Sequence, residues 1–172
     1  MAYDELKKQA YDNLADFSEK VGHEINPDSF CLLPFVHIST MPHGEIKLCC
    51  RGQPPEGGTS KDNPHVQDPG FDLKEYWTSD YMNEIRDDLL QGKRVAQCKN
   101  CWKMEDRNIL SLRHNRLIDY GYEPRESYVE NVKTYMDTGE IPFNVPLLAV
   151  SYTHLRAHET LRYLVCRLLL EK

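Results

Sequence analysis

The sequence has no run of about 18 apolar residues, the length that a membrane-spanning helix needs. Its first residues, MAYDELKKQAYDNL, are charged and amphipathic, so they do not resemble a secretory signal. Basic residues are too few for a protein that follows a phosphate backbone, because 21 Lys and Arg stand against 27 Asp and Glu, a net charge of −6. We therefore expect a cytoplasmic protein that binds neither membranes nor nucleic acid.

Six cysteines then need another explanation than disulfides. Cytoplasmic thiols are kept reduced, so cysteines there are more often metal ligands or reactive groups. A length of 172 residues is typical of one domain, with at most an appendage. No internal repeat or low-complexity tract divides the chain.

The C-terminal residues differ from the rest in charge. Residues 151–172 carry four basic and two acidic side chains, a net of 4 − 2 = +2, so residues 1–150 carry −6 − 2 = −8. The stretches VSYTHLRAHET (150–160) and LVCRLLLEK (164–172) resemble two constant blocks of a translated transposase-type sequencing adapter, in one frame. We expect residues 149–172 to be a non-native, adapter-encoded tail. The alternative is a C-terminal amphipathic helix with a leucine run. Without the tail, Cys166 drops out and five cysteines remain.

Hydrophobic periodicity predicts an α+β fold, with a small antiparallel hairpin sheet and three to four helices around a cysteine site. An apolar stripe predicts a helix over residues 4–21; it consists of Leu6, Ala10, Leu14, Phe17 and Val21. Alternating apolar and polar residues on both sides of a turn at Gly44 predict a hairpin over residues 35–50. Residues 51–70 contain four glycines and four prolines and are expected to form a loop.

Capping residues predict the later helices. Asp72 with Glu75 forms a capping box for a short helix, and Ser79 can cap a second one. Further helical patterns cover residues 102–120, with Gly121 as the stop, and residues 126–138, with Gly139 as the stop.

Cys98 and Cys101 form a Cys-x-x-Cys pair. This spacing lets two thiolates converge on one metal through a tight turn that leads into a helix. Zinc sites, iron–sulfur sites and thioredoxin-like redox pairs share it. A thioredoxin-like pair needs a preceding strand, whereas the polar residues 91–97 precede this one, so we expect a pair of ligands.

The hairpin brings Cys31 near its return strand, which carries Cys49 and Cys50. Neighbours on a strand point to opposite faces, so only one of these two faces a shared site. Four thiolates suit zinc as well as an iron–sulfur cluster. Spacing alone leaves both metals open, although a zinc site would more often present a second Cys-x-x-Cys.

This pattern resembles the twitch domain, a shortened SPASM auxiliary domain of radical SAM proteins. Cys31, Gly44 and Cys49 fit the family opening of Cys, nine to fifteen residues, Gly, four residues and Cys. Further similarity lies in FCLLPFVHIS (30–39), WTSDYMNEIR (77–86) with Gly92, and the Glu-x5-Ser-x-Arg pattern of Glu105, Ser111 and Arg113. Asn108 stands where the family often has Gly, and Asn also tolerates a left-handed backbone.

The resemblance covers about residues 28–121. It implies an auxiliary [4Fe–4S] cluster held by Cys31, Cys49, Cys98 and Cys101, with Cys50 as an alternative ligand. It also implies a radical SAM core in the same polypeptide, where a Cys-x3-Cys-x2-Cys motif binds a second cluster and S-adenosylmethionine. This sequence has no such triplet, so we expect a fragment truncated before the core and not catalytic alone. It would aid substrate positioning or electron relay for a peptide or small-molecule substrate.

The expected organisation is an N-terminal amphipathic helix (1–27), the cluster domain (28–121), a helix and linker toward the core (122–148) and the tail (149–172). The alternative function is a structural zinc-binding interaction module with four cysteine ligands. His37 and His43 could donate hydrogen bonds to the ligands or be minor ligands, but a packed or solvated histidine is the more common case. Glu105 and Arg113 could bind substrate or pair with each other, and we expect a structural role for them.

Overall fold

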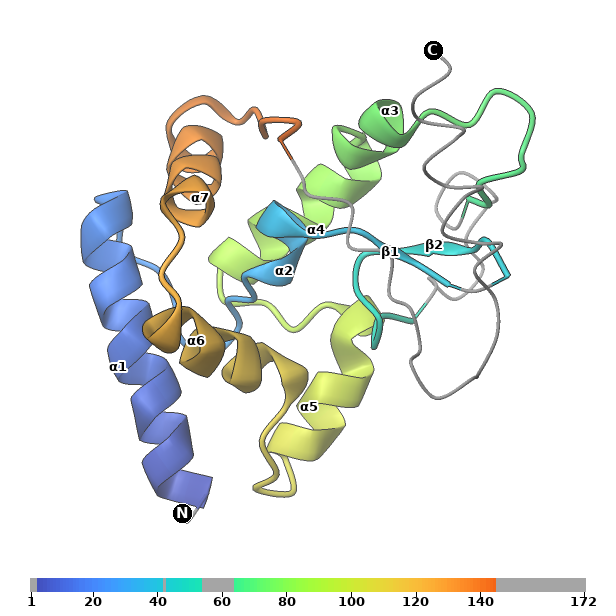
Figure 1. Ribbon diagram of the computed structural model, residues 1–172. Helices are drawn as coiled ribbons and strands as arrows, with labels where there is room; N and C mark the ends of the chain where they lie inside the picture. The colour runs from blue at the N-terminus through green and yellow to red at the C-terminus, as the bar shows by residue number, and fades with distance from the viewer. Residues whose placement is uncertain (1–2, 42, 54–63, 145–172) are drawn as a thin grey trace.

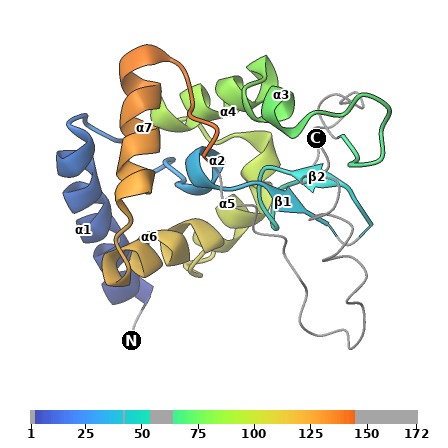
Figure 2. The same ribbon diagram turned by 45° about the horizontal axis from the view of Figure 1, so that its top comes forward.

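The computed structural model describes residues 3–41, 43–53 and 64–144 (Figures 1 and 2). The expected tail, residues 149–172, lies outside the described residues. The fold is α+β as predicted, with one two-stranded antiparallel sheet, but the described part has seven α-helices where three to four were expected. The elements are α1 (Tyr3–Val21), α2 (Leu33–Val36), β1 (Ser39–Thr40), β2 (Ile46–Lys47), α3 (Leu73–Trp77), α4 (Asp80–Leu90), a 3-10 turn (Ala96–Cys98), α5 (Lys99–Glu105), α6 (Leu112–Tyr122) and α7 (Glu126–Thr138).

Helices α1, α6 and α7 lie side by side at one end of the molecule, and the small sheet lies at the other, with α2 between them (Figures 1 and 2). Helix α1 buries Ala10, Leu14, Phe17 and Val21, which are four of the five residues of the predicted stripe. The Phe17 ring meets the Tyr120 ring of α6 edge-on, with 5.0 Å between their centroids. The N-terminal helix therefore shares the core of the rest of the chain.

The hairpin has shorter strands than expected. Ser39 pairs with Lys47, and Thr40 pairs with Ile46, in antiparallel register. The turn closes where the Gly44 N–H donates to the Met41 carbonyl at 2.8 Å. Gly44 has φ 97°, and a side chain there would collide with the His65 imidazole.

The expectation of a strand from residue 35 is wrong for residues 35 and 36, which belong to helical turn α2. Pro34 occupies the first turn of that helix, where its fixed φ and missing N–H favour a helix start. All four side chains of α2 are buried, so this helical turn lies inside the core.

The single helix expected over residues 102–120 is also wrong, because the chain breaks between α5 and α6. Asn108 has φ 56°, which is the left-handed region, and the Ile109 N–H closes the end of α5 on the Met104 carbonyl at 2.9 Å. Ser111 then caps α6 by accepting from the His114 N–H. Helix α6 runs through the expected stop, Gly121, to Tyr122.

The other predicted caps are confirmed. The Asp72 carboxylate accepts hydrogen bonds from two backbone N–H groups at the start of α3, and the Ser79 hydroxyl accepts one at the start of α4. Gly139 ends α7 in the left-handed conformation, with φ 73°. No helix within the described residues is long and apolar enough to cross a membrane.

Candidate metal centre

Four cysteines line one cavity of the described structure. They are Cys31, Cys49, Cys98 and Cys101, and the rest of the lining is Leu33, Trp102, Leu112 and Arg113. All four cysteines are free and at most 8% exposed. The fold thus brings together thiols from three segments that are far apart in the sequence, and surrounds them with mainly apolar side chains.

Local structure explains why these segments meet. Cys31 lies just before α2, whereas Cys98 and Cys101 bracket the start of α5. The hairpin end that carries Cys49 is attached to that start by two hydrogen bonds. The Gln53 N–H donates to the Gln97 carbonyl at 2.9 Å, and the Asn100 amide donates to the Arg51 carbonyl at 3.2 Å.

Burial raises the pKa of all four thiols, that of Cys49 to about 12. Mutual repulsion of neighbouring thiolates raises the pKa values of Cys31, Cys49 and Cys98 further. Without a cation these thiols therefore remain protonated at neutral pH. A metal group that binds them must displace the thiol protons, so its binding is favoured at higher pH.

Backbone N–H groups lie near three of the sulfurs. They belong to Leu33 near Cys31, to Arg51 near Cys49, and to Leu112 and Arg113 near Cys101. Each lowers the pKa of its thiol, since a hydrogen bond to the charged form favours that form. Such donors also stabilise metal-bound thiolates. They are the feature of the site that no sequence pattern revealed.

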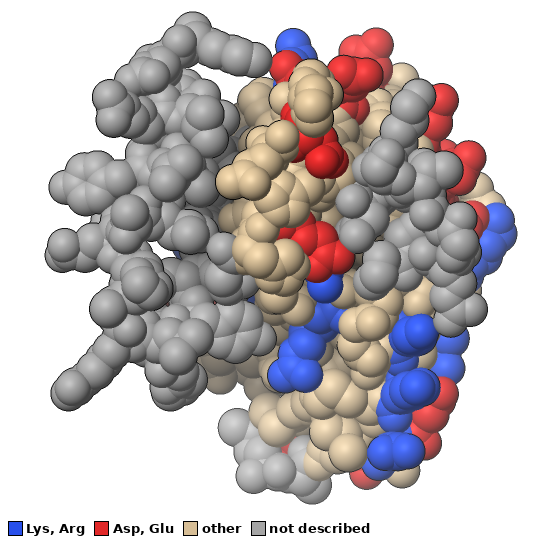
Figure 3. Space-filling model, turned by 90° about the vertical axis from the view of Figure 1, so that its right-hand side faces the viewer, with Lys and Arg blue, Asp and Glu red and all other residues tan. Residues whose placement is uncertain are grey.

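The charge around the Cys-x-x-Cys pair differs from that of the whole chain. Residues 93–107 contain five basic and two acidic residues, a net of 5 − 2 = +3, against −6 for the chain. On the face shown in Figure 3, basic side chains gather toward the bottom and acidic ones toward the top.

By their chemistry, the four cysteines fit a metal group with four thiolate ligands. The present positions of the sulfurs, however, are not those of a formed metal site. Among residues 3–41, 43–53 and 64–144, no three or more His, Cys, Asp or Glu side chains are arranged so that they could hold a metal ion. The cavity between the thiols has a volume of about 10 Å³. Binding there therefore requires the cysteine sulfurs to move from their present positions.

Glu105, Ser111 and Arg113 form a buried network beside the thiols. The Arg113 guanidinium donates to both Glu105 carboxylate oxygens, with Nη2 at 2.7 Å and Nε at 3.1 Å. The Ser111 hydroxyl donates to the same carboxylate at 2.5 Å. Burial opposes ionisation of Glu105, but the bonds from Arg113 and Ser111 outweigh it and lower the pKa of that carboxyl. The chain break at Asn108 is what lets these residues meet, since Ser111 is six positions and Arg113 eight positions after Glu105.

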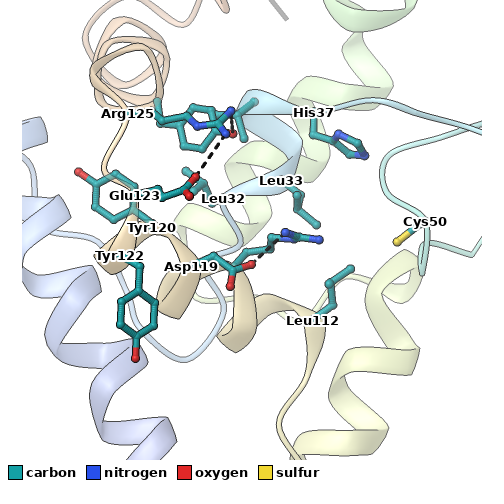
Figure 4. A pocket seen from close by; sticks show the side chains of 13 residues that line it. Leu32, Leu33, His37, Cys50, Leu112, Asp119, Tyr120, Tyr122, Glu123 and Arg125 are labelled. Atoms are coloured by element: carbon teal, nitrogen blue, oxygen red, sulfur yellow. Dashed lines mark hydrogen bonds and ion pairs between the residues drawn. The ribbon is translucent and has the colours of Figure 1, made fainter. Parts of the chain in front are cut away.

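Cys50 does not line the thiol cavity. It opens instead onto a larger cavity of about 550 Å³ between α2, α6 and the start of α7 (Figure 4). Leu33 and Leu112 line both cavities, so the two cavities are neighbours. Several charged and aromatic residues that the sequence analysis did not single out line this second cavity, among them Arg116, Asp119, Tyr120, Glu123 and Arg125.

The two histidines near the hairpin have different surroundings. His37 is 8% exposed, lines the larger cavity and shares a hydrogen bond of 2.8 Å with the Ser39 hydroxyl. Burial and the charge of Arg116 lower the pKa of His37 to about 4, so its imidazole is neutral at pH 7. His43 is exposed and lies 3.1 Å from the Glu45 carboxylate. Neither lines the thiol cavity.

Comparisons with protein-family models, with curated proteins and with solved structures found no match to this chain.

Proposed function

We propose that this chain is a metal-binding domain whose four thiols hold an iron–sulfur cluster, and that it serves as the auxiliary domain of a radical SAM enzyme. The observation that carries the proposal is the convergence of Cys31, Cys49, Cys98 and Cys101, all free and buried, on one cavity. Four thiolates are the usual ligands of a [4Fe–4S] cluster, which would supply one-electron redox chemistry there.

The surroundings support a redox or positioning role. The apolar side chains of Leu33, Trp102 and Leu112 exclude water from the thiols, and burial tunes the reduction potential of such a centre. The neighbouring cavity of about 550 Å³ lies in the range of ligand sites, about 300 to 1,000 Å³. A substrate or the radical SAM core would approach the thiols from there, on the side of Leu33 and Leu112, which line both cavities. A reducing, cytoplasmic compartment suits the free thiols.

A structural zinc site is the second candidate, and the size of the thiol cavity favours it. A volume of about 10 Å³ is close to the space of one water molecule. One zinc ion needs less room than four irons and four sulfides, so zinc requires smaller side-chain movements.

Metal analysis of the full chain, purified without oxygen, distinguishes the candidates. We expect a brown protein with about four iron and four sulfide per chain, and an electron paramagnetic resonance signal after reduction with dithionite. A colourless protein with about one zinc per chain would establish the second candidate. A protein that takes up neither iron with sulfide nor zinc overturns both.

A further inference from the structure

We propose that Arg113 is the positioning residue of the thiol site: it joins the Cys31 segment to the Cys-x-x-Cys helix and supplies the buried positive charge that the thiolates face. The inference rests on the proposed function, because it concerns the metal group that the four thiols would hold.

The first support is the hydrogen bonding of Arg113, whose side chain is 1% exposed. Two of its five N–H groups donate to Glu105, and Nη1 donates to the Pro27 carbonyl at 2.6 Å and to the Phe30 carbonyl at 3.1 Å. The fifth, on Nη2, lies 3.1 Å from Nε2 of His114. All the donors of a guanidinium are thus used within the protein.

The second support is the identity of the segments that these bonds connect. Phe30 directly precedes Cys31, and Glu105 ends the helix that carries Cys101. The backbone N–H of Arg113 itself lies near the Cys101 sulfur, and it lowers the pKa of that thiol. One residue therefore ties together two ligand segments that are 70 positions apart, since 101 − 31 = 70.

The third support is the position of the charge. Arg113 lines the thiol cavity, whereas Glu105, which neutralises it, does not. The positive end of the ion pair therefore lies against the cavity that the sulfurs line, with Nη2 of Arg113 2.7 Å from the Glu105 carboxylate behind it. A nearby positive charge stabilises the more reduced, more negative form of a redox centre, so it raises the reduction potential.

The test uses the full chain loaded with iron and sulfide, with Arg86 as the matched control. Arg86 is also a fully buried arginine that donates to backbone carbonyls, those of Pro34 and Trp77, but it does not line the thiol cavity. A merely structural role would give Arg113→Gln and Arg86→Gln the same effects. Arg113→Lys keeps the positive charge but loses the planar guanidinium with its several N–H donors. Glu105→Gln keeps the guanidinium but removes the carboxylate that neutralises the Arg113 charge.

We expect Arg113→Gln to bind less iron and to shift the midpoint potential of what remains to more negative values. Glu105→Gln should shift it to more positive values, and Arg113→Lys should keep the potential while losing occupancy. Arg86→Gln and Arg86→Lys should leave the potential of the loaded protein unchanged. Equal potentials in all variants, or shifts of the same sign in Arg113→Gln and Glu105→Gln, overturn the inference.

Failure of the proposed function is recognised separately. If the wild-type chain takes up only zinc, the cobalt(II)–thiolate absorption reports binding at the same thiols. Loss of a group that supports metal ligands typically costs ten- to a hundredfold in affinity, so we expect Arg113→Gln to weaken cobalt binding by at least about tenfold relative to Arg86→Gln. Equal cobalt affinities of these two variants overturn the role of Arg113.

Discussion

Cys49 and Cys50 are adjacent in the sequence, yet their side chains reach different cavities. Cys49 is 4% exposed and lines the thiol cavity, whereas Cys50 is half-buried and opens onto the larger cavity (Figure 4). At the scale of single residues, this division places one thiol of the pair beside the other three cysteines and the other thiol apart from them.

Replacement of each cysteine in turn tests that division. Cys49→Ser should lose most of the bound metal, because a serine hydroxyl is a poor ligand for metals that prefer soft sulfur. Cys50→Ser, the matched control, should retain it. The measurement is iron, sulfide and zinc content per chain. Equal losses in the two variants would mean that both sulfurs reach the site, as a bulged strand would allow.

A second prediction at this scale concerns His37 and pH. Its pKa falls from 6.5 to about 4 on folding, mainly because of burial. Between these values the unfolded chain binds more protons than the folded one, so the free energy of unfolding falls as the pH falls from 6.5 to 4. The shift corresponds to about 3 kcal/mol at pH 4.

Urea denaturation of the metal-free chain at about pH 7, 5.5 and 4.5 measures this effect. His37→Gln should lose less stability than the wild type between about pH 7 and 4.5, because glutamine takes up no proton. His43→Gln controls for the loss of an exposed imidazole. The same pH slope in His37→Gln and the wild type would contradict the prediction.

At the scale of elements, the break between α5 and α6 is what shapes the site. Uninterrupted helix over residues 102–120 would separate Glu105 from Arg113 by more than two turns. The left-handed conformation of Asn108 reverses the chain, and the Glu105 carboxylate then reaches both Ser111 and Arg113. The network beside the thiols therefore depends on one exposed residue.

Substitution at this residue tests the role of its backbone conformation. Asn108→Ala should lower the free energy of unfolding by about 1 kcal/mol, because a left-handed backbone strains a residue with a Cβ. Asn108→Gly should leave it unchanged or raise it. Asn115→Ala, on the exposed side of α6, is the control, and should be neutral or slightly stabilising. Equal denaturation midpoints for the alanine and glycine variants at position 108 would contradict this role.

At the scale of the whole molecule, two regions differ in the interactions that stabilise them: the helices α1, α6 and α7, and the region from Cys31 to α5. The α1 stripe packs against α6 and α7 through apolar and aromatic side chains. The described residues from Cys31 to α5 contain the 11-residue helix α4, but the segments that carry the cysteines are short: the four-residue helix α2, the two-stranded sheet and the 3-10 turn. Four thiols meet there, so a bound metal group would cross-link segments that have little regular structure of their own.

Removal of a bound metal group should therefore destabilise the region from Cys31 to α5 more than the helices α1 and α7. We expect chelation or oxidative loss of the metal group to unfold part of residues 28–121 and to reduce the circular dichroism signal. Hydrogen exchange should speed up most at the hairpin and α5, and least in α1 and α7. An unchanged circular dichroism spectrum and unchanged exchange in the metal-free protein would contradict this prediction.

Much of the local structure could be predicted from the sequence. The Asp72 and Ser79 caps, the α1 stripe and the turn at Gly44 all depend on interactions within a few residues. The errors lie at positions where the core decides. Val36 has strand-like alternation, but Pro34 and complete burial make its segment helical. Residues 102–120 have one helical pattern, and only the pairing of Glu105 with Arg113 shows why it must break.

For the candidate site, the spacing of the cysteines by itself determined which thiols are candidates, because a Cys-x-x-Cys pair and strand alternation are local properties of the backbone. Only the tertiary structure decided that the four thiols meet and that Cys50 faces another cavity. It also decided that backbone N–H groups and a buried arginine surround the sulfurs. The physical reason is range: a hydrogen-bond donor or a charge acts over a few ångströms in space, and residues 31, 49, 98 and 113 come within that distance only when the chain is folded.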